Sequence, residues 1–199
     1  LKVSKHESAG GFTVETKPIK GTIPRGKSTE EDIKNSEILR NSQKDRAENV
    51  MIVDLLRNDL SKNCIPGSVS VPKLFALETF PNVHHLVSTV IGKLSPISSA
   101  LDVLRDAFPG GSITGAPKKR AMEIIEQLEP LKRSVYCGSI GYISTNGRMD
   151  TSIAIRTVLA SNQNMHCWGG GGIVADSVPS DELAESINKI SIIMTTLEA

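Results

Sequence analysis

Three strand-like runs follow one another in the last third of the chain. They cover residues 136–144, 151–161 and 164–168, and short turns at residues 145–147 and 162–163 join them. Turn residues such as Asn-Gly between β-prone runs are typical of hairpins, which pair neighbouring strands in antiparallel order. Helical patterns lie before and after these runs, so we expect an α+β fold in which helices cover an antiparallel sheet.

The helical patterns occupy four parts of the chain. The longest begins after Ser28, where acids fill the first turn, and continues with a break to about residue 60. Others are predicted over residues 98–107, between Pro117 and Pro130, and from about residue 180 to 197. Further strands are expected at residues 1–5, 12–16, 68–71 and 85–91, whereas prolines and glycines predict loops at 17–26 and 110–117. Without an internal repeat or linker, residues 1–199 are expected to form one domain.

The charge balance excludes two kinds of partner. The 199 residues carry 23 Lys and Arg against 22 Asp and Glu, so the net charge is +1. Such a chain is held by bulk charge neither to nucleic acid nor to an anionic membrane. Its apolar runs are too short to span a bilayer, and it begins at Leu1 without a targeting pattern. Three scattered cysteines predict no disulfide framework and no zinc site. We therefore expect a soluble, cytoplasmic protein.

Two pairs of acidic residues lie on separate predicted helices. Asp45 and Glu48 are three residues apart, as are Glu182 and Glu185, so each pair shares one helix face. Two such faces brought together supply the oxygen ligands by which Mg²⁺ is usually held. The alternative is two solvated faces, because acids at this spacing are common and Glu182 also complements a helix N-terminus.

Other polar features allow two interpretations each. Consecutive glycines at 169–172 let backbone N–H groups face an anion, or simply make a tight connection. Arg156 lies in an apolar run, where a buried guanidinium must meet a protein acid or a ligand carboxylate. His84 and His85 are adjacent in a predicted strand, so they face opposite sides and at most one enters a given site.

Five motifs occur in a fixed order along the chain. They are PIKGT at 18–22, DRAENVMIVD at 45–54, GSITGAPK at 111–118, DTSIAIRT at 150–157 and GGGIVADS at 170–177. Together they closely resemble the chorismate-utilising enzymes, a family that includes anthranilate, isochorismate, salicylate and aminodeoxychorismate synthases. The resemblance implies a layered α/β/β/α sandwich with a mostly antiparallel sheet. Family members are considerably longer, so the chain corresponds to the C-terminal portion of the catalytic domain, and the fold is here incomplete.

The first motif is informative about the product. In aminodeoxychorismate synthases the middle residue of this motif is Lys, and here it is Lys20. In anthranilate synthases the residue at this position is usually Ala. The resemblance implies that Lys20 attacks the chorismate ring as a covalent nucleophile. Ammonia from a glutamine amidotransferase subunit then enters where the ring hydroxyl stood, giving 4-amino-4-deoxychorismate. An attacking amine must be neutral, which requires desolvation or a neighbouring cation.

The resemblance also implies roles for the remaining candidates. Glu48 and Glu185 match direct ligands of Mg²⁺, and Asp45 and Glu182 match groups that reach it through water. That metal neutralises the ring carboxylate and polarises the ring. His85 matches an active-site histidine. The positions that match substrate contacts are Gly21, Thr22, Ser112, Tyr136, Arg156, Gly170, Gly172 and Lys189.

Alternatives to this function remain open. The family's general acid and lysine base precede a strand like residues 1–5 and are absent from this chain, so we expect little or no turnover by the chain alone. Within the same fold, the rival activities are those of anthranilate synthase component I and of the isochorismate and salicylate synthases. From another class, the rival is a non-catalytic fragment that binds a partner protein.

Overall fold

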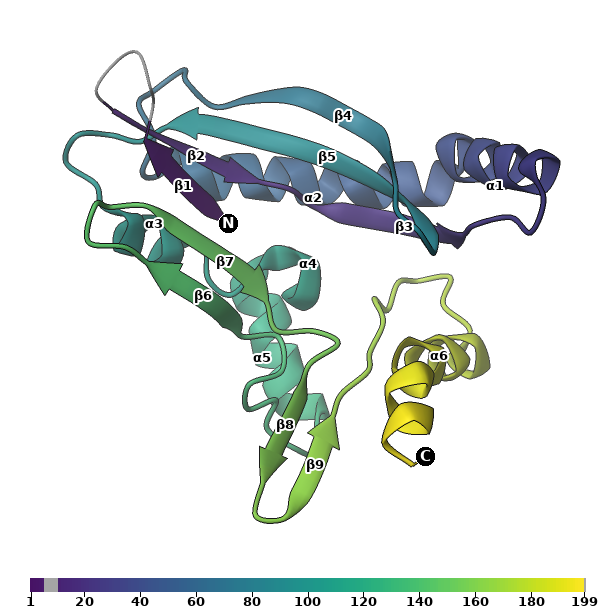
Figure 1. The fold of residues 1–199 in the computed structure, drawn as a ribbon. Coiled ribbons are helices and arrows are strands. Elements are labelled where there is room, and N and C mark those ends of the chain that lie inside the picture. Colours follow the sequence, from purple (N-terminus) through teal and green to yellow (C-terminus); the bar gives the residue numbers. More distant parts are fainter. Residues whose placement is uncertain (6–10, 199) are drawn as a thin grey trace. The chain divides into compact units, whose positions relative to one another are not determined.

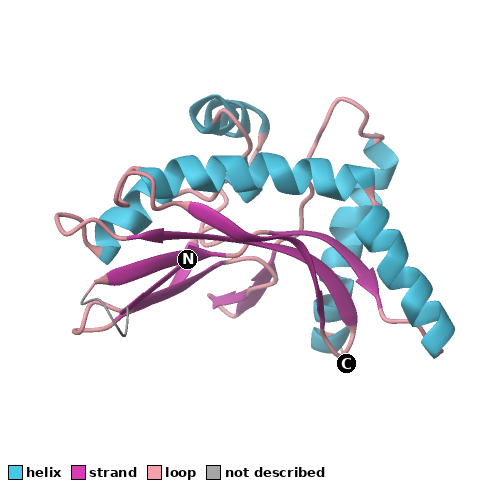
Figure 2. Ribbon diagram, turned by 90° about the horizontal axis from the view of Figure 1, so that it is seen from above, coloured by secondary structure: helices cyan, strands magenta, loops and turns pink. Residues whose placement is uncertain are grey.

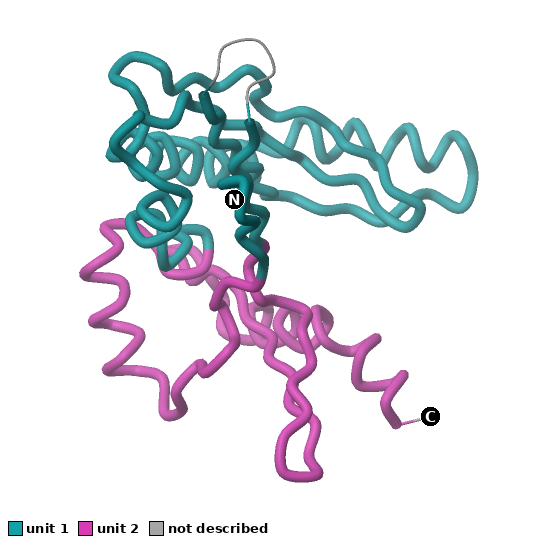
Figure 3. Tube along the Cα trace, turned by 60° about the vertical axis from the view of Figure 1, so that its left-hand side comes forward, with its two compact units in different colours: residues 1–112, 141–151 teal, residues 113–140, 152–199 magenta. Residues whose placement is uncertain are grey.

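The structure is a computed structural model that describes residues 1–5 and 11–198 (Figure 1). It divides into two compact units (Figure 3). Unit 1 comprises residues 1–112 and 141–151, and unit 2 comprises residues 113–140 and 152–199. The sequence predicts a turn over residues 7–11, and residues 7–10 of it lie outside the described residues. The single domain expected over 1–199 stays a prediction.

Unit 1 is built on a seven-stranded sheet with the order β3-β5-β2-β1-β7-β6, in which β4 also pairs with β5. The strands are β1 (Lys2–Lys5), β2 (Phe12–Thr16), β3 (Ile19–Pro24), β4 (Ser70–Thr79), β5 (Val83–Lys93), β6 (Ser139–Ile143) and β7 (Met149–Ile153). The first half of β5 pairs with β3 and its second half with β2, while β4 runs along its other edge, all antiparallel. The predicted antiparallel sheet is therefore confirmed.

Helices cover one face of this sheet. They are α1 (Thr29–Asn41), α2 (Gln43–Ser61) and α3 (Ala100–Ala107), and Figures 1 and 2 show α2 running along the strands. The expected break in the long helix is confirmed at Ser42, whose extended backbone ends α1. Its hydroxyl accepts a hydrogen bond from the Asp45 N–H at 3.3 Å, so one serine ends α1 and caps α2.

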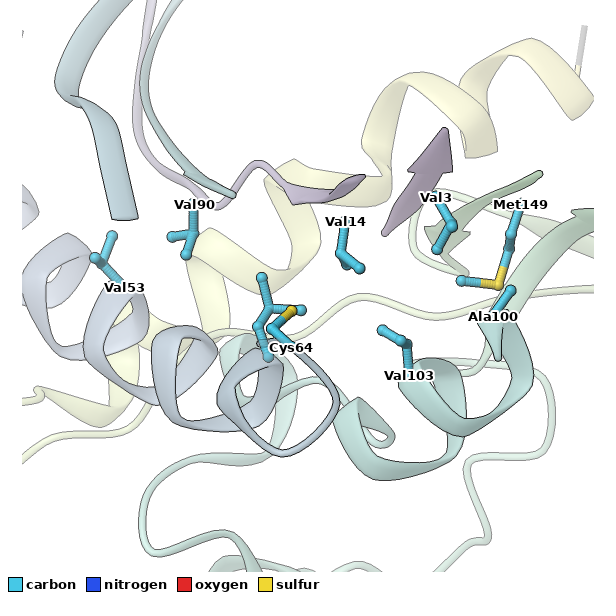
Figure 4. Close-up of a cluster of buried hydrophobic side chains, with 9 residues drawn as sticks. Val3, Val14, Val53, Cys64, Val90, Ala100, Val103 and Met149 are labelled. Atoms are coloured by element: carbon cyan, nitrogen blue, oxygen red, sulfur yellow. The ribbon is translucent and has the colours of Figure 1, made fainter. Parts of the chain in front are cut away.

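The core of unit 1 lies between the sheet and these helices (Figure 4). Val53 and Leu60 are seven residues apart on α2, which places them two turns apart on one helix face. Val3 and Val14 are cross-strand neighbours in β1 and β2, and they face the same side of the sheet. The buried cluster consists of Val3, Val14, Val53, Leu60, Cys64, Val90, Ala100, Val103 and Met149.

Unit 2 contains two helices and a hairpin. The helices are α5 (Lys118–Leu128) and α6 (Pro179–Leu197), and the hairpin pairs β8 (Val158–Ser161) with β9 (Asn164–Cys167). Its turn residues Asn162 and Gln163 both have positive φ, at 51° and 62°, which is the geometry of a two-residue hairpin turn. The short helix α4 (Gly111–Thr114) lies at the unit boundary. Among the described residues, no helix combines the length and the apolar character needed to cross a bilayer.

Three sequence-based predictions of secondary structure were wrong. Residues 17–26 contain the strand β3, because pairing with β5 satisfies their backbone groups in spite of the prolines and glycine. Residues 110–117 contain α4 rather than only a loop. The single strand expected at 151–161 is divided between β7 and β8, and Arg156 with φ of 53° lies between them. Ala154 there pairs with Cys137 and Gly138 outside any named strand.

Candidate active site

Strand β3 presents Lys20 and Gly21 to helix α2. The β3–β5 register shifts between Ile19 and Thr22, and Gly21 within the shift has φ of +88°. Lys20 Nζ donates a hydrogen bond to Glu48 Oε1 at 2.5 Å, and its side chain is 18% exposed. The side chain of Lys20 is thus largely shielded from water, which is one of the two conditions named for an attacking amine. The other condition, a neighbouring cation, is not what the structure places there: the charged group at the Lys20 nitrogen is the carboxylate of Glu48.

The acid pair on α2 faces the same part of β3. A Cβ atom placed on Gly21 would lie 2.9 Å from Asp45 Cγ and 2.8 Å from Leu39 Cδ1, so Asp45 lies directly against the glycine. Glu48, one turn later, meets Lys20. Both acids are half-buried. The prediction that they share one helix face is confirmed, and this face is covered by β3 rather than fully solvated.

Replacing Gly21 with Ala should destabilise the protein at this contact. The added methyl both strains a backbone with positive φ and collides with Leu39 and Asp45, so we expect a loss of about 2 kcal/mol or more in the free energy of unfolding. Urea titration measures the change. The matched control is Gly67→Ala, where φ is +76° but no atom lies within 4 Å. Equal losses in the two variants would show that the close packing of Asp45 contributes nothing.

The two neighbouring histidines face opposite sides of β5, as predicted. His85 Nδ1 lies 2.8 Å from Thr22 Oγ1, and its ring meets Phe80 edge-on at 5.4 Å. Burial lowers the pKa of His85, and the nearby Glu78 opposes this shift only in part. The imidazole is therefore mainly neutral near pH 7. Thr22 and His85 form one polar pair, built from β3 and β5.

His84 belongs to a separate network that ties β3, β5, β4 and α1 together. Its Nε2 lies 3.0 Å from Asp32 Oδ1, and its Nδ1 lies 2.9 Å from Thr79 Oγ1. Asp32 also accepts from Arg25 Nε and Nη2, at 2.7 and 2.8 Å, and from the Gly26 N–H at 2.8 Å. These bonds, led by the guanidinium of Arg25, hold the pKa of Asp32 well below its usual range. The network fixes the end of the strand that carries Lys20 and Thr22.

This network should make stability depend on acid pH. Because the pKa of Asp32 is lower in the folded than in the unfolded protein, its contribution is complete above about pH 4 and is lost as the pH falls toward the folded value. Urea midpoints measured between about pH 6 and pH 3 should therefore fall less steeply in Asp32→Asn than in the wild type. The control is Glu30→Gln, in the same first turn of α1. Parallel profiles for wild type and Asp32→Asn would contradict the expectation.

In unit 2, the second acid pair lies on α6 beside the glycine-rich segment. Lys189 Nζ donates to Glu185 Oε1 at 2.5 Å and to the Gly170 carbonyl at 3.0 Å. Glu182 Oε1 accepts from Ser177 Oγ at 2.6 Å, while Glu182 Oε2 is buried without a hydrogen-bond partner in the described part of the chain. A Cβ on Gly171 would lie 2.8 Å from this oxygen. The absence of a side chain at Gly171 thus lets this unpartnered carboxylate oxygen lie close to the backbone.

An aromatic group borders the same glycines. The Tyr136 ring stacks on Trp168, with centroids 6.3 Å apart, and the Arg133 guanidinium lies 5.9 Å from the tyrosine ring. A Cβ on Gly170 would lie 2.8 Å from the Tyr136 hydroxyl oxygen. Burial raises the pKa of Tyr136 to about 12, so its hydroxyl remains a hydrogen-bond donor at neutral pH.

The structure places the remaining predicted residues as follows. Arg156 is exposed between β7 and β8 and makes no ion pair or side-chain hydrogen bond within the described residues. The prediction that it is buried in a strand is therefore wrong, because the chain bends there instead of continuing the sheet. Ser112 is half-buried in α4, and Gly172 is exposed ahead of α6.

The acid pairs have the donor chemistry of a hard-cation site. Carboxylate oxygens suit Mg²⁺, and the buried Glu182 Oε2, which has no hydrogen-bond partner among the described residues, is an oxygen available to such an ion. Within residues 1–5 and 11–198 no cluster of three or more His, Cys, Asp or Glu is positioned to hold a metal, and each unit carries one acid pair.

Sequence reasoning missed several polar contacts at these sites. Ser177 belongs to a quoted motif, and its position within that motif was the available signal for its bond to Glu182. The sequence contains no comparable signal for the Arg25–Asp32–His84 network, because these residues come from separate parts of the chain. Trp168 was expected only as the end of a strand.

Comparison with known proteins gives consistent similarities. A family profile described as chorismate binding enzyme matches residues 7–195. Aminodeoxychorismate synthase component 1 of Salmonella typhimurium is 56% identical over 185 residues, which cover 93% of this chain and 41% of that protein. Anthranilate synthase component 1 of Aquifex aeolicus is 47% identical over 185 residues, covering 93% of this chain and 37% of that protein. The chain thus spans about two fifths of the length of these curated relatives.

Solved structures agree with the fold. Anthranilate synthase component I from Streptococcus pneumoniae superposes with a TM-score of 0.82 at 42% identity, covering 94% of this chain and 40% of that one. The expected α+β fold class, with helices and a mostly antiparallel sheet, is confirmed by this similarity and by the strand pairings of unit 1.

Proposed function

The chain belongs to the family of chorismate-binding enzymes, and from this premise we propose that it forms part of an enzyme that aminates chorismate to 4-amino-4-deoxychorismate. The observation that carries the proposal is Lys20, a largely buried lysine in contact with the conformationally unusual Gly21 of β3. The higher identity to an aminodeoxychorismate synthase than to an anthranilate synthase, 56% against 47%, supports the same product.

Lys20 acts as the nucleophile in this proposal. Its neutral amine forms a bond from Nζ to a ring carbon, the ring double bonds shift, and the ring hydroxyl departs as water after gaining a proton. Ammonia then bonds to the carbon that carried the hydroxyl, and the Nζ–carbon bond breaks to release the lysine. The sum is chorismate plus ammonia giving 4-amino-4-deoxychorismate plus water. A covalent intermediate of this kind divides one difficult substitution into two easier ones.

The polar pair of Thr22 and His85 assists at the ring hydroxyl. His85 is mainly neutral, because burial lowers its pKa. Its Nδ1 is engaged with Thr22, and its Nε2 has no hydrogen-bond partner among the described residues. An imidazole held in this way can exchange a proton at a single, defined nitrogen. We assign it to the departing hydroxyl.

The groups of unit 2 bind the substrate's carboxylates. Arg156 is exposed and unpaired within the described residues, so its guanidinium is available to a carboxylate in a bidentate geometry. Tyr136 stays protonated and can donate as well, since its pKa is raised to about 12. The other proposed substrate contacts are Gly21, Ser112, Gly170, Gly172 and Lys189.

A magnesium ion completes the proposed site. We assign Glu48 and Glu185 as its direct ligands, with Asp45 and Glu182 reaching it through water, and the buried unpartnered oxygen of Glu182 supports this donor set. When bound, the ion supplies Lewis-acid stabilisation of the ring carboxylate and the leaving hydroxyl. The ammonia is proposed to come from a glutamine amidotransferase subunit, consistent with the name component 1 of the Salmonella relative. A cytoplasmic location is part of the same proposal.

The test is to identify the product. The protein encoded by the full natural coding sequence around this chain is incubated with chorismate, Mg²⁺ and ammonium, and the products are analysed by mass spectrometry. We expect a product in which an amino group replaces the ring hydroxyl, and a chorismate-derived mass increase on the Lys20 peptide under trapping conditions. Anthranilate as the product would instead support the rival activity of the Aquifex aeolicus relative.

The non-catalytic alternative is separated by the same assay. If no chorismate is consumed with either ammonium or the amidotransferase subunit, while that subunit still binds, the chain belongs to a partner-binding protein. Product formation that is unchanged in Lys20→Ala would reject the covalent role and keep the family assignment.

A further inference from the structure

Two carboxylates on α2 face β3, and one lysine pairs with one of them. Lys20 Nζ binds Glu48 Oε1 at 2.5 Å. The Asp45 carboxylate makes no ion pair or side-chain hydrogen bond within the described residues. The face therefore retains one negative charge that no side chain within the described residues pairs with, and both acids are half-buried, so water screens that charge only in part. A single ammonium therefore compensates this face only in part.

The corresponding lysine of unit 2 is anchored more firmly. Lys189 Nζ binds Glu185 Oε1 at 2.5 Å and also the Gly170 carbonyl at 3.0 Å. Lys20 has Glu48 as its hydrogen-bond acceptor, with no second one in the part of the chain that the structure describes. Losing that contact therefore releases the Lys20 nitrogen, whereas Lys189 would still be held by the backbone.

We infer that Lys20 and a divalent cation exchange at Glu48, so that the cation, on binding, displaces the ammonium and frees the lysine. This inference rests on the proposed metal role of Glu48. Two positive groups at one half-buried carboxylate repel each other strongly, and a dication compensates Asp45 and Glu48 together where one ammonium cannot. Before the cation arrives, Lys20 serves as its internal substitute and keeps the acid pair from standing unpaired.

The exchange makes cation binding and Lys20 release one event. Lys20 is held away from the substrate while the acid pair lacks its cation, and it becomes available when the cation is bound. The geometry thus imposes an order in which the cation binds first and the nucleophile is released second, through a contact that joins β3 directly to α2.

The test is the affinity for Mg²⁺, measured by isothermal titration calorimetry on the protein from the full natural coding sequence, without substrate. Lys20→Met removes the competing charge and should bind Mg²⁺ about fivefold more tightly, or better, than the wild type. Lys20→Arg keeps the charge and should stay close to the wild type. Lys17→Met is the matched control, because Lys17 pairs with Glu78 at 3.9 Å and is about half exposed.

Each outcome bears on a different claim. If Glu48→Gln weakens Mg²⁺ binding but Lys20→Met does not strengthen it, the exchange is wrong and the metal assignment stands. If Glu48→Gln leaves binding unchanged, the metal assignment of the proposed function fails together with the exchange. If Lys17→Met strengthens Mg²⁺ binding as much as Lys20→Met does, the gain in affinity comes from the overall charge of the protein, and the exchange is wrong. Absence of Mg²⁺ binding in both the wild type and Lys20→Met also overturns it.

Discussion

With Glu48 as a proposed Mg²⁺ ligand, Glu48→Gln is expected to lower the rate of chorismate turnover on the order of a thousandfold, since the several kcal/mol of charge stabilisation proposed for the ion would be lost. The substitution keeps the shape of the side chain but removes its charge. Helix α2 turns Glu48 and Asp45 toward β3. Product formation from chorismate, Mg²⁺ and ammonium measures the effect.

The control for this variant lies on the same helix. Asp54→Asn neutralises another carboxylate of α2, one that is 63% exposed and pairs along the helix with Arg57. It should leave turnover within about twofold of the wild type, because an exposed pair of this kind contributes little. If Glu48→Gln turns over chorismate as fast as the Asp54→Asn control, Glu48 is not part of the active site. The folded state of both variants is checked by far-ultraviolet circular dichroism.

Leu60→Ala should lower the free energy of unfolding by about 3 kcal/mol. Leu60 is fully buried in the cluster between α2 and the sheet. Truncation removes its apolar contacts and leaves a cavity that the surrounding β-sheet cannot fully close. Urea unfolding followed by circular dichroism gives the value.

The comparison for Leu60 is Leu101→Ala. Leu101 lies on α3 and is 62% exposed, so the same change of side chain should alter the free energy of unfolding by no more than about 0.5 kcal/mol. Similar losses in the two variants would mean that burial at position 60 does not govern stability. A loss at Leu60 alone supports the core as described.

Much of the fold could be predicted because its signals are local. The cap at Ser28 and the acids that follow it lie within one helix turn, and the structure has the helix that they predict. The helical pattern that continues to about residue 60 is present as α2. The acid pairs were predicted for the same reason, since residues three apart on a helix share a face whatever surrounds them. The opposite directions of His84 and His85 follow from the alternation of a strand.

The errors occurred where distant pairing outweighed local preference. Gly21 and Pro24 disfavour a strand, yet β5 supplies partners for the backbone of β3 and makes one. At Arg156 the apolar run predicts continuous β-structure, but the chain bends between two separate sheets and leaves the guanidinium in solvent. Neither the strand β3 nor the bend at Arg156 can be predicted from the residues immediately around it in the sequence.

The order of five motifs in the sequence was enough to indicate the family, because each motif is a short local string, and the family profile that matches residues 7–195 confirms it. The tertiary structure alone decided which charges meet. Lys20 and Glu48 are 28 positions apart, and they form an ion pair because β3 is laid against α2 by its pairing with β5. That contact places a carboxylate, rather than a cation, at the proposed nucleophile, and only packing between distant segments could bring the two together.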